Sequence, residues 1–291
     1  MIKISLIIPT LGRDIELLPL LNSLVNQTFK EFELIIVDQN GDNRVNNVLK
    51  KFEGQLDYKH IKTEIRGAAR ARNIGITIAT GKLITFPDDD CWYPYDLLKN
   101  VNRLFDEHSE WEAISGKLVD PEGKSGLGRW SKKDGLIDRY NLWTRHTEVT
   151  LFIRRYVFDK INGFDELLGV GAGTKWGSGE SADLVLKMLG TDFKIYYNQN
   201  INIHHPITID TAEINCFSEK VYKKTYHYAL GMGYVMGRYK YPHWYILYFC
   251  IRPLSGGILE LFKSYNKSKY YRLILKGRIK GYLAGRYKAK I

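Results

Sequence analysis

Cysteine is scarce in this chain. The three cysteines, Cys91, Cys216 and Cys250, are widely spaced among 291 residues and form neither a CxxC pair nor a zinc-ligand pattern. Their small number excludes a disulfide-rich secreted domain, because such a domain depends on many paired cysteines. We therefore expect the protein to work in a reducing compartment.

Long apolar runs are also absent. The N-terminal run, residues 4–8, is too short for a signal peptide, and no small-residue cleavage site follows it. We expect this run to be a buried strand. The most apolar part of the tail, residues 243–262, is interrupted by Arg252 and Pro253 and is too short to span a bilayer unaided. We expect it to be a helix in the membrane interface, with Tyr, Trp, Lys and Arg at the headgroups.

Acidic residues are missing mainly from one part of the chain. Residues 210–291 contain 16 Lys and Arg against 4 Asp and Glu, a net charge of +12, whereas residues 1–209 contain 27 against 28, a net charge of −1. We therefore predict two regions, a near-neutral domain at 1–209 and a basic, aromatic, helical region at 210–291. The basic region favours an anionic partner: a membrane surface, a nucleic acid or a polyanionic substrate. Nucleic acid is the least favoured, because the tail has no recognised nucleic-acid-binding motif.

Strand and helix patterns alternate through the first 105 residues. Short apolar runs typical of strands lie at residues 4–8, 33–37, 58–61 and 83–86, and apolar residues at helical spacing lie between them. This alternation predicts an α/β fold with a mostly parallel sheet and helices on both faces. The expected later elements are strands at 147–153, 193–197 and 201–205, a helix at 180–189, and glycine-rich loops at 116–135 and 169–179.

Polar residues follow three of the predicted strands. Thr10 to Arg13 come after the first strand, Asp38 after the second, and Asp88 to Asp90 after the fourth. Ligands of parallel sheets bind beyond the carboxyl ends of the strands, so one crevice could hold all three groups. The three adjacent carboxylates repel each other and lose hydration when buried, so a cation among them makes the cluster favourable. Oxygen ligands suit Mg²⁺ or Mn²⁺, which commonly also hold phosphates. A solvated acidic turn is the alternative.

Six motifs occur in an order that identifies a family. They are SLIIPTLGR at 5–13, LLNSLVNQTFKEFELIIVDQN at 20–40, GAARARNIGI at 67–76, ATGKLITFPDDDCWYPYDLL at 79–98, GFDE at 163–166 and GSGESADLVLK at 177–187. With them the chain resembles the family 2 glycosyltransferases over about residues 3–209. The resemblance implies the Rossmann-like GT-A fold, a nucleotide-diphosphate sugar donor and transfer with inversion.

The resemblance also implies a donor site. Asp88 and Asp90 match the family's DxD signature, in which Asp90 binds a metal that bridges the two phosphates and Asp88 contacts the ribose or the metal's waters. Asp38 would accept hydrogen bonds from the base, most often uracil, with a helix cap as the alternative. The implied nucleotide-sugar-binding residues are Pro9, Thr10, Arg13, Asp38, Arg70, Arg72, Asn73, Asp88 and Asp89.

Two further groups of this donor site have open alternatives. Arg70 or Arg72 would face the phosphates, because guanidinium suits that anion, although both could be plain solvated charges. His205 lies where related enzymes often have a histidine near the metal, so the implied metal ligands are Asp88, Asp90 and His205. An imidazole among oxygen ligands favours Mn²⁺ over Mg²⁺, and a purely structural histidine is the alternative.

The catalytic base is expected near the start of the predicted helix at 180–189. The common family form has Glu-Asp here with the Asp as base, whereas this chain has Glu180-Ser181. A serine hydroxyl is far too weak a base at neutral pH, so Glu180 or Asp183 is left to take the acceptor's proton, and Glu180 is favoured. Trp176, in the glycine-rich loop before them, is either a platform for an acceptor sugar or an anchor for that loop.

We therefore expect an inverting glycosyltransferase that moves a sugar from a UDP-sugar to a hydroxyl of a glycan or lipid-linked glycan in cell-surface polysaccharide synthesis. It would act in the cytoplasm at the inner face of the membrane, with its tail on anionic lipid or, alternatively, against another copy of the chain. A nucleotidyltransferase acting on a sugar phosphate is one alternative. That activity would want a glycine-rich loop after the first strand, where residues 10–13 have one glycine. A non-catalytic sugar-nucleotide or membrane-binding protein is another, which Ser181 permits.

Overall fold

The computed structural model describes residues 3–124, 128–206 and 217–287. The chain forms two compact units, one of Met1–Phe164 with Leu184–Ile207 and the other of Asp165–Asp183 with Thr208–Ile291. The predicted domain boundary between residues 209 and 210 lies outside the described residues, so the division at that point stays a prediction.

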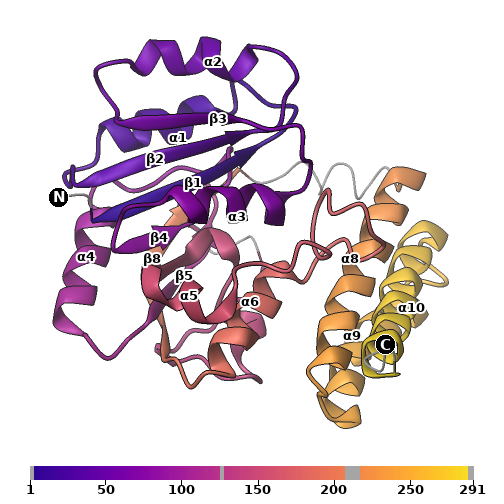
Figure 1. Cartoon of the computed structure of the whole chain (residues 1–291). Coiled ribbons are helices and arrows are strands. Elements are labelled where there is room, and N and C mark those ends of the chain that lie inside the picture. Colours follow the sequence, from indigo (N-terminus) through magenta and orange to yellow (C-terminus); the bar gives the residue numbers. More distant parts are fainter. Residues whose placement is uncertain (1–2, 125–127, 207–216, 288–291) are drawn as a thin grey trace. The chain divides into compact units, whose positions relative to one another are not determined.

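The first unit is built on an eight-stranded sheet with the order β3-β2-β1-β4-β7-β5-β8-β6 (Figure 1). The strands are β1 (Ile4–Thr10), β2 (Phe32–Asp38), β3 (Tyr58–Lys62), β4 (Leu83–Thr85), β5 (Ala113–Val119), β6 (Gly135–Leu136), β7 (Leu151–Arg154) and β8 (Ile195–His204). The pairs β1–β2, β1–β4, β2–β3 and β5–β8 are parallel, whereas β4–β7, β5–β7 and β6–β8 are antiparallel. The predicted α/β fold with a mostly parallel sheet is confirmed.

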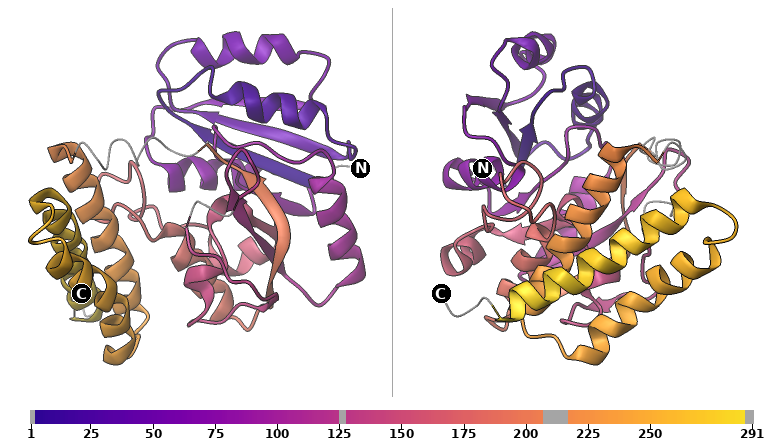
Figure 2. Two further views of the ribbon diagram at one scale, coloured as in Figure 1. Left: turned by 180° about the vertical axis from the view of Figure 1, so that it is seen from behind. Right: turned by 90° about the vertical axis from the view of Figure 1, so that its right-hand side faces the viewer.

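Helices cover both faces of this sheet. They are α1 (Leu17–Val25), α2 (Arg44–Leu49), α3 (Ala68–Ile78), α4 (Leu97–Glu107) and α5 (Phe158–Ile161), with short 3-10 helices η1 (Lys50–Phe52), η2 (Leu142–Thr144), η3 (Glu148–Thr150) and η4 (Arg155–Val157). Residues of α1 and α4 share one apolar cluster with Ile4, Leu6 and Ile8 of β1. On the other face, a Cβ added to Gly75 of α3 would lie 2.2 Å from the side chain of Ile7. Alternate residues of a strand point to opposite faces, so α1 and α3 lie on opposite sides of the sheet, as Figures 1 and 2 show.

Three predictions for the middle of the chain were wrong. Residues 147–153 do not form one strand, because Thr147 and Thr150 cap η3 reciprocally and pairing in β7 begins only at Leu151. Residues 193–197 and 201–205 do not form two strands, because β8 is continuous and pairs with β5 on both sides of an irregularity between Ser115 and Lys117. The first four residues of the predicted loop at 116–135 belong to β5 instead, in which Gly116 lets the backbone of β8 approach closely.

In its described residues the second unit contains three long helices, and the predicted helical character of the C-terminal region is confirmed (Figure 2). They are α8 (Glu219–Arg238), α9 (His243–Leu259) and α10 (Tyr265–Tyr287), and α6 (Glu180–Leu189) begins in this unit and continues into the first. A Cβ on Gly237 of α8 would lie 2.1 Å from the carbonyl oxygen of Tyr282, and one on Gly281 of α10 would lie 2.1 Å from that of Leu230. Glycine therefore allows α8 and α10 to pack backbone against backbone. Within the described residues, no helix combines the length and apolar character needed to cross a membrane.

Candidate active site

Asp88, Asp90 and His205 come together in the first unit. Each offers one ligand atom, and these atoms lie within 4.8 Å of one another. The aspartates follow β4 and His205 follows β8, two strands that run in the same direction through the sheet. Their carboxyl ends therefore lie at the same edge, which is where ligands of such sheets bind.

A short bridge holds the two ends together. The backbone N–H groups of Trp92 and His204 each donate to the other residue's carbonyl, at 2.9 and 3.0 Å, and the two rings stack with centroids 5.4 Å apart. The N–H of His205 donates to the carbonyl of Val119 at 3.0 Å, so β5 fixes the same segment. The convergence of Asp88, Asp90 and His205 thus rests on backbone contacts between segments that are far apart in the sequence.

Arg13 neutralises part of the charge in this cluster. Its guanidinium lies 2.7 Å from a carboxylate oxygen of Asp89 and 2.5 Å from one of Asp90. His205 Nε2 lies 3.1 Å from the other oxygen of Asp90. Burial opposes the ionisation of Asp90, but the hydrogen bond from His205 and the charge of Arg13 outweigh it and lower the pKa of Asp90. Burial raises the pKa of Asp89, in spite of Arg13.

Asp88 lies in the least favourable surroundings for a carboxylate. Burial, reinforced by the negative charges of Glu148, Asp90 and Asp89, raises its pKa to about 7, although Arg72 opposes the shift. The guanidinium of Arg72 lies 3.4 Å from Asp88 and 3.5 Å from Glu148. Together Asp88, Asp89, Asp90 and Glu148 form what we call the acidic cluster.

Glu148 is the member of the acidic cluster that sequence reasoning missed. It lies in the first turn of η3, where the Thr147 hydroxyl donates to its carboxylate at 2.9 Å. Its pKa is lowered, because the charge of Arg72 and local hydrogen bonds outweigh the effect of burial. Arg72 is 76 positions away in the sequence, so no local spacing signals the pair.

The donor set fits a divalent cation. Two carboxylate oxygens and an imidazole nitrogen converge, and Arg13, Arg72 and His205 are cationic groups in contact with the acidic cluster. Mixed oxygen and nitrogen ligands suit Mn²⁺ well, and Mg²⁺ would rely more on the carboxylates. A cation here would offset the excess negative charge that raises the pKa of Asp88.

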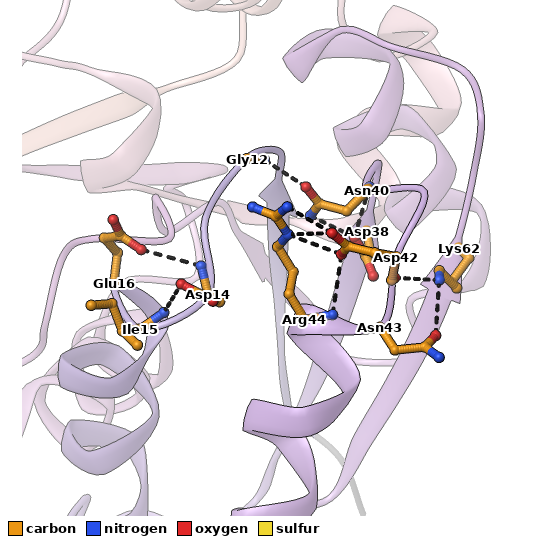
Figure 3. A network of polar contacts seen from close by, with 10 residues as sticks. All are labelled: Gly12, Asp14, Ile15, Glu16, Asp38, Asn40, Asp42, Asn43, Arg44 and Lys62. Carbon is orange, nitrogen blue, oxygen red and sulfur yellow. Dashed lines mark hydrogen bonds and ion pairs between the residues drawn. The ribbon is translucent and has the colours of Figure 1, made fainter.

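Asp38 lies in a different kind of polar network, part of which Figure 3 shows. Its Oδ1 accepts from the backbone and side-chain nitrogens of Asn40, at 2.9 and 2.8 Å. Its Oδ2 lies 3.0 Å from Nε2 of His60. The side chain of Asn40 in turn accepts from the N–H of Gly12 at 2.7 Å. The four residues, which we call the Asp38 network, link the ends of β1 and β2 to the middle of β3. Sequence reasoning named Asp38 but missed His60.

The remaining predicted donor residues fall into two groups. Pro9 and Thr10 are buried at the end of β1, where Thr10 pairs with Asp38 of β2. Asn73 is hydrogen-bonded to the turn after α5. Its side-chain amide donates to the carbonyl of Phe164 at 3.0 Å and accepts from the N–H of Phe164 at 2.9 Å. The guanidinium of Arg70 donates to the carbonyl of Arg66 at 2.9 Å. The structure thus shows structural contacts for Asn73 and Arg70, and their donor roles stay predictions.

Both base candidates lie in the second unit, in the first turn of α6. Glu180 is buried, and its carboxylate packs against the backbone of Gly169, where an added Cβ would lie 2.5 Å from the carboxyl carbon. Asp183 is fully buried and accepts from the hydroxyl of Tyr239 at 3.0 Å. Arg238 lies 3.5 Å from Asp183 and 2.5 Å from Asp165. Asp183 therefore joins α6 to the end of α8.

Trp176 is held within the second unit. Its ring stacks on that of Tyr234 in α8 with centroids 4.1 Å apart, and Lys175 Nζ lies 4.8 Å from the Trp176 ring centroid. The N–H of Gly169 donates to the carbonyl of Trp176 at 2.9 Å, closing the glycine-rich loop on itself. These contacts match the loop-anchor alternative, and the acceptor-platform role stays a prediction.

Sequence comparisons agree with the motifs. A family model described as "Glycosyl transferase family 2" matches residues 5–162, more than half of the chain. TarS of Staphylococcus aureus strain Mu50, a poly(ribitol-phosphate) beta-N-acetylglucosaminyltransferase, is 31% identical over 132 residues, which cover 44% of this chain and 22% of TarS. A GalNAc(5)-diNAcBac-PP-undecaprenol beta-1,3-glucosyltransferase of Campylobacter jejuni is 33% identical over 146 residues, 47% of this chain and 46% of the relative. The matched part thus spans less than half of each relative.

Solved structures share the fold over nearly the whole chain. Staphylococcus aureus TarS 1–349 in complex with UDP-GlcNAc has a TM-score of 0.61 at 16% identity, covering 98% of this chain and 90% of that one. Mannosyltransferase PcManGT from Pyrobaculum calidifontis, in complex with GDP-Man and Mn²⁺, has a TM-score of 0.61 at 14% identity, covering 99% and 88%. Likeness at such low identity shows the fold alone, and that fold is the predicted GT-A fold.

Proposed function

Because the chain belongs to glycosyl transferase family 2, we propose that it moves a sugar from a UDP-sugar to a hydroxyl of a glycan or lipid-linked glycan in cell-surface polymer synthesis. The names of two relatives support the acceptor class, one acting on poly(ribitol-phosphate) and one on an undecaprenol-linked glycan. The donor class is supported by the structures of TarS with UDP and with UDP-GlcNAc. The observation that carries the proposal in this chain is the convergence of Asp88, Asp90 and His205.

The metal half of the site would manage the leaving group. Mn²⁺ or Mg²⁺ held by Asp88, Asp90 and His205 would stabilise the charge that grows on the departing nucleoside diphosphate. Arg13 and Arg72 hold the carboxylates in place, since they contact Asp89, Asp90 and Asp88 directly. Their role in this proposal is to position the ligands and to limit their mutual repulsion.

The nucleotide half of the site would use the ends of β1 and β2. Pro9, Thr10 and Asp38 lie at adjacent strand ends, which suits contact with a base and ribose. Asp38 already accepts from Asn40 and lies beside His60, so its orientation is set before a nucleotide arrives. In this proposal the segment that carries Arg70 and Asn73 approaches the diphosphate and ribose of the donor.

Glu180 is the proposed base. Asp183 accepts from Tyr239 and lies near Arg238, which supports a structural role for Asp183. The acceptor oxygen would form a bond to the anomeric carbon while the bond from that carbon to the phosphate oxygen breaks. The acceptor's proton would pass to the Glu180 carboxylate, and the diphosphate would depart with the electron pair. One such displacement inverts the anomeric configuration.

Product analysis tests the reaction class. The full chain is incubated with Mn²⁺, a panel of UDP-sugars and either a polyol-phosphate or a polyprenyl-linked glycan, and UDP and glycosylated acceptor are quantified. We expect equal amounts of UDP and product. In a parallel incubation with UTP and a sugar phosphate, formation of pyrophosphate would identify a nucleotidyltransferase instead. Donor binding without transfer or hydrolysis across the panel would identify a non-catalytic binding protein.

A pair of isosteric variants tests the base. Glu180→Gln should lower the transfer rate by about 10²-fold or more while leaving UDP–Mn²⁺ binding unchanged, because a base acts on the acceptor and not on the donor. Asp183→Asn should lower thermal stability more than it lowers the rate per folded molecule. Glu53→Gln, at an exposed position, is the matched control. Turnover that survives Glu180→Gln would refute the assignment.

We also propose that the basic helical region rests on an anionic membrane surface at the inner face of the membrane. Residues 217–287 carry 14 Lys and Arg against 2 Asp and Glu, which supports attraction to anionic lipids. A lipid-linked acceptor would be displayed at that surface. Pairing of this region with a second copy of the chain is the competing arrangement.

A further inference from the structure

Helix α9 has two apolar faces, one buried and one exposed. Its inner face, which includes Tyr245, Ile246, Cys250 and Pro253, is buried within the second unit. Hydrogen bonds from α10 fix this side. The hydroxyl of Ser268 donates to the carbonyl of Gly257 at 2.7 Å, and the Arg278 guanidinium donates to that of Phe249.

The outer face carries a continuous row of large apolar side chains. We call this row the outer stripe, and its members are Trp244, Leu247, Tyr248, Ile251, Leu254 and Ile258. Each of them is between 49% and 63% exposed. Steps of three and four residues keep them on one side of the helix. Phe262, one more such step beyond Ile258, is 91% exposed.

A stripe of this size is unusual on a protein surrounded by water. From Trp244 to Ile258 it runs for about 21 Å along α9, and contiguous exposed apolar patches usually mark an interaction site. It follows the exposed side of a single helix. That shape suits a flat, deformable partner.

The charge of this region indicates which partner. Arg252 lies on α9 itself and is exposed, Lys263 follows the helix, and residues 217–287 as a whole carry 14 Lys and Arg. The acidic residues of 217–287 are Glu219 and Glu260. Pairing two copies through this region would bring two strongly basic surfaces together. An anionic lipid surface instead complements the charge and accepts the apolar stripe, and Trp and Tyr suit the headgroup layer.

We infer that the outer stripe of α9 lies in the headgroup and upper acyl layer of a bilayer rich in anionic lipid, with Arg252 and Lys263 at the phosphates. This inference deepens the membrane association proposed above and rests on it, but it does not depend on the identity of the sugar or acceptor.

Vesicle binding of the full chain tests this inference. Co-sedimentation is compared between phosphatidylcholine vesicles and vesicles that also contain phosphatidylglycerol. We expect at least about tenfold tighter binding to the anionic vesicles, falling as salt is raised. The variant Leu247→Ser/Ile251→Ser/Ile258→Ser should lose about tenfold or more of that binding, because it removes apolar area that enters the lipid.

The matched control changes three equally exposed apolar residues of the first unit. Ile15→Ser/Ile65→Ser/Leu136→Ser removes similar side chains at 66%, 55% and 51% exposure, and it should bind vesicles like the unchanged protein. Circular dichroism and the thermal shift given by UDP with Mn²⁺ should be the same for all three proteins. A missing UDP shift in the unchanged protein would count against the proposed enzyme, while vesicle binding would still test the stripe.

Several outcomes would overturn the inference. One is equal vesicle binding by the outer-stripe variant and the unchanged protein. Another is equal binding to neutral and anionic vesicles. A third is absence of vesicle binding together with self-association, seen by analytical ultracentrifugation, that the outer-stripe variant abolishes. That result would assign the stripe to a second copy of the chain.

Discussion

Two acidic groups lie at strand ends of the same sheet, and the surroundings of their carboxylates differ. The Asp38 network surrounds one carboxylate with Asn40 and His60, and each oxygen has a partner. The acidic cluster instead crowds Asp88, Asp89 and Asp90 together with Glu148, so that burial and mutual repulsion raise the pKa of Asp88 to about 7. The first arrangement is complete in itself. The second becomes favourable when a cation joins it, so the difference separates an oriented recognition residue from a metal site.

Asp90→Asn should have the largest effect, because it changes the acidic cluster and leaves the Asp38 network intact. Loss of a metal-ligating charge should lower the rate of sugar transfer by about 10²-fold or more, because the cation that stabilises the leaving diphosphate is held less well. The measurement is the initial rate at saturating donor over a range of Mn²⁺ concentrations. Asp57→Asn, at an exposed position before β3, should behave like the unchanged protein. A full rate with an unchanged Mn²⁺ dependence in Asp90→Asn would contradict the proposed role of Asp90 as a metal ligand.

Asp38→Ala should affect stability and nucleotide binding but not the metal. The change leaves buried donors of Asn40 and His60 without their acceptor, which should cost about 1–3 kcal/mol of unfolding free energy. Urea unfolding measures that cost, and Mn²⁺ binding without nucleotide should be unaltered. Loss of Mn²⁺ binding in a folded Asp38→Ala protein would show that the two groups are not separate.

Glu33 is another buried carboxylate with hydrogen-bond partners, like Asp38, and Glu33→Gln tests how much its charge stabilises the fold. Burial opposes ionisation of Glu33, but hydrogen bonds from Lys59, Ser5 and Thr80 outweigh it and lower the pKa of Glu33 from 4.5 to about 2. A carboxylate with a lowered folded pKa stabilises the fold above its unfolded pKa, and this contribution disappears as the pH falls toward the folded value. We therefore expect Glu33→Gln to cost about 1 kcal/mol at pH 7.

The same contribution should shrink as the pH falls from about 4.5 to about 2, the two pKa values of Glu33. Thermal or urea unfolding of both proteins at pH 7, 4 and 3 measures the change. A stability difference that stays constant over this range would show that the Glu33 charge does not stabilise the fold.

The sequence predicted the parallel core well, because buried strands leave strong local signals. The runs in β1, β2 and β4 are apolar, and each is followed by polar residues at the carboxyl end. Candidates such as Asp88 and Asp90 could be named for the same reason. His205 was named only through the family resemblance, and the structure brings it within ligand distance of both.

The remaining features depend on contacts between distant segments. Glu148 reaches Arg72 across 76 positions and His60 reaches Asp38 across 22, so no short motif announces either pair. The prediction of a strand at 147–153 was wrong because the Thr147 cap favours a 3-10 turn. The alternation of apolar residues in this segment gives no sign of that turn. The continuity of β8 depends on pairing with β5, which the sequence around residue 200 does not reveal.

Binding of Mn²⁺ itself tests the central claim most directly. Electron paramagnetic resonance counts free and bound Mn²⁺ when the ion is titrated into the full chain with UDP present. We predict one bound ion per chain in the unchanged protein and at least about tenfold weaker binding in both Asp88→Asn/Asp90→Asn and His205→Gln. Asp57→Asn should bind as the unchanged protein does. Equal Mn²⁺ affinity in all four proteins would contradict the assignment of the acidic cluster and His205 as the metal site.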